Sequence, residues 1–189
     1  MATTRDLLVD TMKQLLWERG YDATSPNHVL ERSGVGKGSF YHHFKSKKDL
    51  AVAAMEARAD DLIAEFDSLI SQSSGDWFDK VCAYLQLPRH ALKGCRMGRI
   101  VQDPSVGDDQ LLAPLDRYFS TMHQRFSGIY QEAQRQDKLA KTIPAEALAT
   151  LTLSVIQGGF VVGKATSQDQ IVDETSGSFM TLLESLKRH

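Results

Sequence analysis

The spacing of apolar residues along the chain is helical throughout. Leu8, Met12 and Leu15 recur at intervals of three and four residues, which places them on one stripe of a helix that ends at Gly20. The same spacing predicts a long helix over about residues 47–70. No segment shows the strict alternation of apolar and polar residues that is typical of a strand. The pattern therefore predicts an all-α protein.

Two short helices are predicted before the long one. Ser25 and Pro26 form an N-cap followed by a proline at the first helical position, and the helix that they open ends at Gly34. A second short helix is predicted over about residues 37–43. Two short helices joined by a glycine-containing turn form the helix-turn-helix plan, in which the second helix enters the DNA major groove.

The rest of the chain is predicted to form further helices separated by polar breaks. They cover about residues 77–87, a long stretch marked by Leu115 to Ile129, residues 144–164 and residues 169–186. A shorter segment is expected around residues 95–101. The last two helices carry one apolar stripe each, and this predicts that they pack against other helices.

Composition places the chain among soluble globular proteins. It has 189 residues, 42% of them hydrophobic and 24% charged. No apolar run approaches the ~20 residues needed to cross a bilayer, and the N-terminus has no apolar signal region, so a cytoplasmic location is expected. The two cysteines, Cys82 and Cys95, cannot form a disulfide framework, and no metal-ligand spacing is present. We expect neither a metal nor a cofactor.

Charge is distributed unevenly along the chain. The net charge is −2, yet residues 1–50 carry eight Lys or Arg against six Asp or Glu. Between Arg32 and Lys48 there are five basic residues and no acidic one. This stretch either meets a polyanion such as DNA or is a solvated basic surface, and charge alone does not decide between the two.

The stretch SGVGKGSFYHHFKSKKDL, residues 33–50, resembles the recognition signature of the TetR family of transcriptional regulators. That signature is a short helix ending in Tyr-His-x-Phe, followed by Lys-Ser-Lys and an acidic-Leu pair. Residues 20–25 resemble the family's approach to the preceding helix, and the likeness covers about residues 5–55. Two residues depart from the pattern: Gly36 stands where a Ser or Thr cap is usual, and Leu30 replaces a small residue.

The resemblance implies a helix-turn-helix DNA-binding domain over residues 1–48 and a helical ligand-sensing and dimerisation domain over residues 49–189. Phe40 and Phe44 are expected in the core of this DNA-binding domain, which we call the head. Phosphate contacts are implied for Thr24, Ser25, Tyr41 and Lys47, and base-edge contacts for Lys37, Gly38, Ser39 and His42, with Lys37 the candidate for guanine.

The last two helices resemble the pair through which the family dimerises. Small residues inside the apolar helix over 144–164 support this, because glycine there costs ~1 kcal/mol relative to alanine and calls for a packing reason. The alternative is a kinked core helix in a monomer. These small residues are Ser154, Gly158, Gly159 and Gly163.

The middle helices are expected to enclose a small-molecule effector. Most aromatic residues at helical spacing are simply core, so each candidate has a structural alternative. The candidates are Trp77, Tyr84, Cys95, Met97, Tyr118, Phe119, Met122, His123, Phe126 and Phe160.

Cys95 is the candidate with distinctive chemistry. Residues 94–98, GCRMG, resemble the Gly-Cys segment of the N-ethylmaleimide-reductase-repressor-like subgroup of the family, which senses electrophiles through a cysteine. Basic neighbours, and a helix N-terminus if one starts at Gly94, would favour the thiolate. The alternative is a cysteine that only packs or lines the pocket, as in relatives that bind drugs or flavonoids reversibly.

The expected function is a homodimeric repressor that leaves a palindromic DNA operator when it binds a small molecule. The alternative is a repressor switched by covalent modification of Cys95 by electrophiles or oxidants. An enzyme with Cys95 as nucleophile and His90 or His123 as base lacks an orienting residue and an oxyanion motif, so no catalytic residue is expected. A structural adaptor without a DNA role is the remaining reading.

Overall fold

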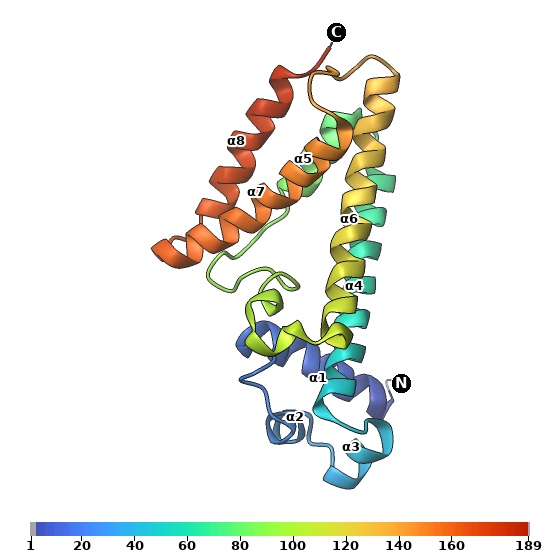
Figure 1. Ribbon diagram of the computed structural model, residues 1–189, viewed down its shortest axis with the longest axis vertical. Coiled ribbons are helices and arrows are strands. Elements are labelled where there is room, and N and C mark those ends of the chain that lie inside the picture. The colour runs from blue at the N-terminus through green and yellow to red at the C-terminus, as the bar shows by residue number, and fades with distance from the viewer. Residues whose placement is uncertain (1–2, 189) are drawn as a thin grey trace. The chain divides into compact units, whose positions relative to one another are not determined.

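The computed structural model describes residues 3–188, which are helical and contain no β-strand (Figure 1). Only an isolated bridge joins Leu139 and Lys187. The all-α prediction is confirmed. The elements are α1 (Thr4–Arg19), α2 (Pro26–Ser33), α3 (Lys37–His43), α4 (Lys47–Gln72), α5 (Trp77–Leu85), the 3₁₀ helices η1 (Ile100–Gln102) and η2 (Pro104–Gly107), α6 (Asp109–Arg135), α7 (Ala145–Thr166) and α8 (Ile171–Ser185).

The chain divides into two compact units. Unit 1 contains the chain up to Leu62 together with Arg96–Tyr118, and unit 2 contains Ile63–Cys95 and the chain from Phe119 onward. Unit 1 thus holds α1 to α3 and both 3₁₀ helices, and unit 2 holds α5, α7 and α8. The division between functional domains expected after residue 48 remains a prediction.

The short helices of the head begin and end where free backbone groups find partners. The Ser25 hydroxyl oxygen accepts the His28 amide N–H at 3.3 Å, and His28 Nδ1 accepts the Ser25 amide N–H at 3.2 Å. This reciprocal capping box opens α2. Gly34 ends α2 in the left-handed conformation, at φ +69°. The predicted bounds of α2 and α3 are confirmed. They could be predicted because capping signals act within a few residues.

The core of unit 1 joins α1, α2, α3 and the start of α4. Leu8 and Met12 of α1, Val29 of α2, Phe40 of α3 and Leu50 of α4 are fully buried. Phe44, just after α3, is buried as well, so the expectation that both phenylalanines belong to the core is confirmed. This packing fixes α3 on the head and leaves its other face to solvent.

In unit 2, α7 packs against α8 (Figure 1). At Gly163 of α7, an added Cβ would lie 2.6 Å from the Ala91 Cβ and 2.7 Å from the Gln168 carbonyl oxygen, so the segments outside α8 also pack closely on this helix. Between α6 and α7, the Tyr130 hydroxyl lies 2.8 Å from the Thr152 hydroxyl. Both side chains are buried, so this bond is shielded from water.

One expectation needs correction: no helix starts at Gly94, which has φ +79° and is followed by a turn up to η1. Helix α7 has 22 residues and a mean hydropathy of 1.5 over its most apolar window, so among the described helices it alone is long and apolar enough to span a membrane, by length and composition only. It is also a packing helix, since it buries seven residues, among them Leu148 and Ile156.

Candidate DNA-binding face and sensor residues

The outer face of α3 carries the residues predicted to read bases. Lys37, Gly38, Ser39 and His42 are exposed, and the Tyr41 side chain is 49% exposed. A Cβ added to Gly38 would meet nothing within 4 Å, so the chain's own packing does not require glycine there. A bare backbone at an exposed position suits close approach to another molecule.

The two residues predicted to hold phosphate at the start of α2 differ. The Thr24 side chain is 1% exposed, its hydroxyl donates to the Gly20 carbonyl at 2.6 Å, and its amide donates to the Tyr21 carbonyl. Both Thr24 donors are therefore used inside the head, and none is left for a phosphate oxygen. Ser25 is half-buried and its hydroxyl oxygen accepts from His28, which leaves its hydrogen available to donate.

Lys47, another predicted phosphate contact, is anchored on Tyr21. Its ammonium donates to the Tyr21 carbonyl at 3.1 Å and lies 3.9 Å from the centre of the Tyr21 ring. An ammonium has three donors, so this arrangement fixes the side chain and leaves hydrogens for a phosphate.

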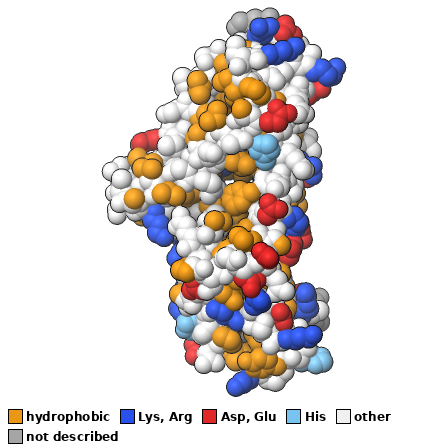
Figure 2. Space-filling view, in the orientation of Figure 1, with side chains coloured by type: hydrophobic (Ala, Val, Ile, Leu, Met, Phe, Trp, Pro, Cys, Tyr) orange, Lys and Arg blue, Asp and Glu red, His pale blue; other side chains and the backbone are white. Residues whose placement is uncertain are grey.

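The basic stretch of residues 32–48 is partly neutralised within unit 1. Arg32 pairs with Glu18 at 2.6 Å, and Lys48 pairs with Asp108 at 3.1 Å. The hydrogen bond from Lys48 lowers the pKa of the Asp108 carboxyl. Lys37 and Lys45 make no ion pair among the described residues, so the positive charge available to a polyanion is concentrated around α3. Figure 2 shows Lys and Arg side chains at this end of the molecule.

Several sensor candidates form part of an aromatic cluster in unit 2. The rings of Tyr84 and Phe126 contact each other edge to face, with centroids 5.3 Å apart, and both contact Phe66 at 5.2 Å. Phe126 and Met122 are fully buried. Such edge-to-face contacts stabilise a core, and a ligand would have to displace part of this cluster to reach its centre.

The other sensor candidates lie apart from this cluster. Phe119 and His123 line an open groove of about 410 Å³ with Thr150 and Leu153. Trp77 is buried and donates through its indole N–H to the Lys138 carbonyl. Phe160 is half-buried on α7, whereas Met97 and Tyr118 are buried and belong to unit 1. The structure thus brings together Tyr84 with Phe126, and Phe119 with His123.

Cys95 is half-buried, and its sulfur accepts a hydrogen bond from the Gln157 side-chain amide of α7 at 3.3 Å. Three of its basic neighbours in the sequence are engaged elsewhere. Arg89 donates to backbone carbonyls at the end of α5, His90 pairs with Asp169, and Arg99 donates to the Trp17 carbonyl. The helix N-terminus that the sequence offered for Cys95 is absent, because a turn follows Gly94.

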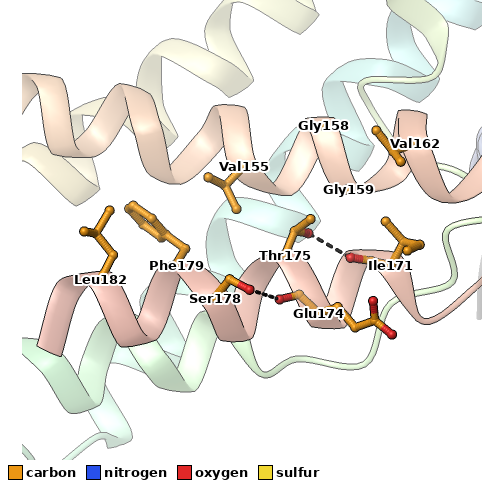
Figure 3. A pocket seen from close by; sticks show the side chains of 10 residues that line it. All are labelled: Val155, Gly158, Gly159, Val162, Ile171, Glu174, Thr175, Ser178, Phe179 and Leu182. Carbon is orange, nitrogen blue, oxygen red and sulfur yellow. Dashed lines mark hydrogen bonds between the residues drawn. The ribbon is translucent and has the colours of Figure 1, made fainter.

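An apolar groove runs along α7 and α8 in unit 2 (Figure 3). It holds about 590 Å³ and is open to solvent along its length. Val155 of α7 and Phe179 and Leu182 of α8 point into the space between the helices, where Gly158 leaves the backbone bare. Figure 2 shows hydrophobic side chains gathered over these two helices.

Sequence reasoning missed two residues that shape the head. His28 stands at the capping-box position where Glu or Gln is expected, and only its nitrogen acceptor reveals the cap. Asp103 accepts the Tyr21 amide N–H at 2.7 Å from 82 residues away. No local pattern around Asp103 or Tyr21 predicts this long-range contact.

Comparison with known proteins agrees with this geometry. The family model described as "Bacterial regulatory proteins, tetR family" matches residues 8–54, which span α2, α3 and most of α1. The chain is 22% identical over 203 residues to an uncharacterized HTH-type transcriptional regulator in the lacX 3′ region of Lactococcus lactis, covering 98% of this chain and 96% of the relative. It is 30% identical over 144 residues to the transcriptional regulator AcuR of Cereibacter sphaeroides, covering 71% and 64%.

Among solved structures, the reduced form of Escherichia coli NemR superposes with a TM-score of 0.84 at 20% identity, over 96% of this chain and 97% of NemR. At that identity the likeness establishes the fold. The match to the family model lies on the same residues that build the exposed α3 face. The chain therefore belongs to the TetR family of bacterial regulatory proteins, as a DNA-binding transcriptional regulator.

Proposed function

We propose that the chain is a homodimeric repressor that binds a palindromic operator through α2 and α3 and is released by a small-molecule effector in the cytoplasm. The observation that carries the proposal is the exposed α3 face with Lys37, Gly38 and Ser39 presented on a buried Phe40 anchor. Two such helices in a dimer would read half-sites about one helical turn, ~34–36 Å, apart.

The groove on α7 and α8 supports a second copy of the chain as partner. Val162 and Leu182, which line the groove, are about half exposed, and a third of the apolar window of α7 is buried within the chain. Exposed apolar area of this kind marks an interface. A two-fold interface places the same groove on both subunits, so bare Gly158 and Gly177, where an added Cβ meets nothing within 4 Å, would allow close helix contact.

The dimer is tested by sedimentation of wild type and Val162→Glu at micromolar concentration. Val162 lines the groove, so a carboxylate there is expected to yield monomer. Val161→Glu is the matched control, because Val161 is equally exposed on the same helix but does not line the groove. Monomeric wild-type protein would refute the proposed dimer.

Operator binding is tested with a duplex of about 30 base pairs selected by the wild-type protein from random sequence, long enough for two half-sites. The affinity should fall linearly on a log-log plot as salt rises, and the selected site should be a palindrome. Release by an effector should then obey linkage: the effector weakens operator binding by the same factor by which operator weakens effector binding. Switching from 99:1 to 1:99 occupancy requires a preference of ~10⁴-fold.

A further inference from the structure

The chain between Cys95 and α6, residues 96–108, lies against the DNA-binding head within unit 1. We name these residues the strap. Its contacts reach the end of α1, the turn before α2 and the start of α4. Arg99 donates to the Trp17 carbonyl at 2.6 Å, Asp103 accepts the Tyr21 amide at 2.7 Å, Asp22 accepts the Ser105 amide at 3.2 Å, and Lys48 pairs with Asp108 at 3.1 Å.

Asp103 packs against the turn between α1 and α2 of the head. A Cβ added to Gly20 would lie 2.7 Å from both Asp103 carboxylate oxygens. Gly20 also adopts φ +83° and ψ 178°, a region that is essentially restricted to glycine. The turn between α1 and α2 therefore brings the bare backbone of Gly20 against the Asp103 carboxylate, so that the next amide, that of Tyr21, can donate to it.

Tyr21 connects Asp103 to the predicted DNA contacts. Its amide donates to Asp103, while its carbonyl accepts both the Lys47 ammonium and the Thr24 amide, each at 3.1 Å. The Lys47 ammonium also lies over the Tyr21 ring. One peptide segment is thus held on one side by the strap and holds Lys47 on the other.

We propose that Asp103 is a positioning residue for operator binding, which fixes Tyr21 and thereby sets Lys47 for contact with a DNA phosphate. Asp103 does not touch DNA; it acts through Tyr21. The inference rests on the operator binding proposed above and adds a determinant of affinity outside the helix-turn-helix. A tethered ammonium loses less freedom on meeting phosphate than a free one, so release of Tyr21 weakens binding.

The test compares Asp103→Ala and Asp103→Asn with wild type on the selected duplex. Asp103→Ala is expected to weaken binding about tenfold, the size of coupling within one hydrogen-bond network, and Asp103→Asn less, because its amide oxygen still accepts. The matched control is Asp109→Asn, which removes the same charge from an exposed residue that makes no hydrogen bond or ion pair through its side chain among the described residues. It is expected to bind as wild type does.

Two readouts separate positioning from general damage. If Asp103 acts on a phosphate contact, Asp103→Ala lowers the salt slope by up to about one unit, as Lys47→Ala does. In the Lys47→Ala background the further loss from Asp103→Ala should shrink below about twofold, since coupled residues are not additive. Thermal melting and sedimentation confirm that each variant remains a folded protein of wild-type assembly.

Equal operator affinity of Asp103→Ala and wild type would overturn the positioning role. So would a loss that is fully additive with Lys47→Ala at an unchanged salt slope, because that result describes a destabilised head. Tighter binding by Asp103→Ala would also overturn it. The wild-type isotherm tests operator binding itself, and the ratio of variant to wild type tests Asp103, so the two failures are distinguishable.

Discussion

A Cβ atom added to Gly159 of α7 would lie 2.9 Å from the Cα of Val172 on α8. The same atom would come within 2.5 Å of the Thr175 hydroxyl oxygen. Backbone cannot give way as a flexible side chain can, so the α7–α8 contact depends on glycine at this position. The adjacent Gly158 faces the open groove, where an added Cβ would meet nothing within 4 Å.

The two neighbouring glycines should therefore respond differently to alanine. Gly159→Ala is expected to lower the free energy of unfolding by ~1–3 kcal/mol through overpacking, offset in part by a gain in helix propensity. Gly158→Ala should keep that propensity gain of up to ~1 kcal/mol within one chain, while crowding the proposed dimer contact. Urea unfolding and sedimentation of both variants measure the two effects. Equal changes in stability would contradict the assignment of Gly159 to the packed side of α7.

The buried pair Tyr130 and Thr152 provides a second stability prediction. The Thr152 hydroxyl donates to the Leu148 carbonyl, so Tyr130 must donate to Thr152. Tyr130→Phe removes this one bond without stranding a donor and should cost ~0.5–1.5 kcal/mol. Thr152→Val leaves the Tyr130 hydroxyl buried without its partner and should cost more, ~1–3 kcal/mol. Thermal unfolding of both variants decides the order; a larger cost for Tyr130→Phe would refute it.

Local signals explain why much of the head could be predicted from sequence. Ser25 followed by Pro26 opens α2, and Gly34 closes it, because caps and left-handed glycines act within a few residues. Phe40 recurs at the spacing of the core stripe and is buried. The exposed residues of α3 follow from the same helix, since the face opposite a buried anchor points to solvent.

Contacts between distant residues explain what could not be predicted. Asp103 meets Tyr21 across 82 residues, and nothing near Asp103 indicates it. The family resemblance implies a phosphate contact for Thr24, and only the fold shows that its hydroxyl donates to Gly20. The sequence does not distinguish the lysines and arginines of residues 32–48 from one another. In the fold, Arg32 pairs with Glu18 and Lys48 pairs with Asp108, whereas Lys37 forms no ion pair among the described residues.

Lys37 should contribute to base preference, whereas Lys45 should contribute only its positive charge to DNA affinity. Both side chains are exposed, and each substitution with alanine removes one positive charge. Lys37→Ala should cost ~1–3 kcal/mol on the selected operator and relax discrimination at one base position, whereas Lys45→Ala should weaken selected and random duplexes alike. Competition binding with single-base operator variants measures this. An equal loss on selected and random DNA for Lys37→Ala would contradict base reading.

Cys82 should make the protein sensitive to alkaline pH. Burial raises the pKa of its thiol to about 11, with a smaller contribution from the carboxylate of Asp79. Because the unfolded thiol ionises first, the stabilisation is fully present below the unfolded pKa and is lost as the pH rises through the folded one. Between about pH 9 and 11, Cys82→Ala should lose stability less steeply than wild type in urea titrations. Parallel curves for the two proteins would show that Cys82 does not contribute.

The raised pKa of Cys82 also predicts which cysteine reacts with electrophiles. Near pH 8 the raised pKa leaves almost no thiolate at Cys82, and the thiolate is the nucleophile. Cys95 is half-buried, and its sulfur accepts a hydrogen bond from the Gln157 side-chain amide. With limiting N-ethylmaleimide, mass spectrometry of the native protein should find the adduct at Cys95 first.

Two further measurements test whether labelling of Cys95 has a function: labelling of Gln157→Leu, and release of the operator by the adduct. Gln157→Leu removes the hydrogen bond to the sulfur at similar size and should slow labelling at Cys95 while leaving Cys82 unchanged. If the adduct is a signal, it should release the selected operator from wild type and not from Cys95→Ser. Preferential labelling of Cys82 would contradict the reactivity prediction. Equal release in Cys95→Ser would show that the thiol reacts without switching the protein.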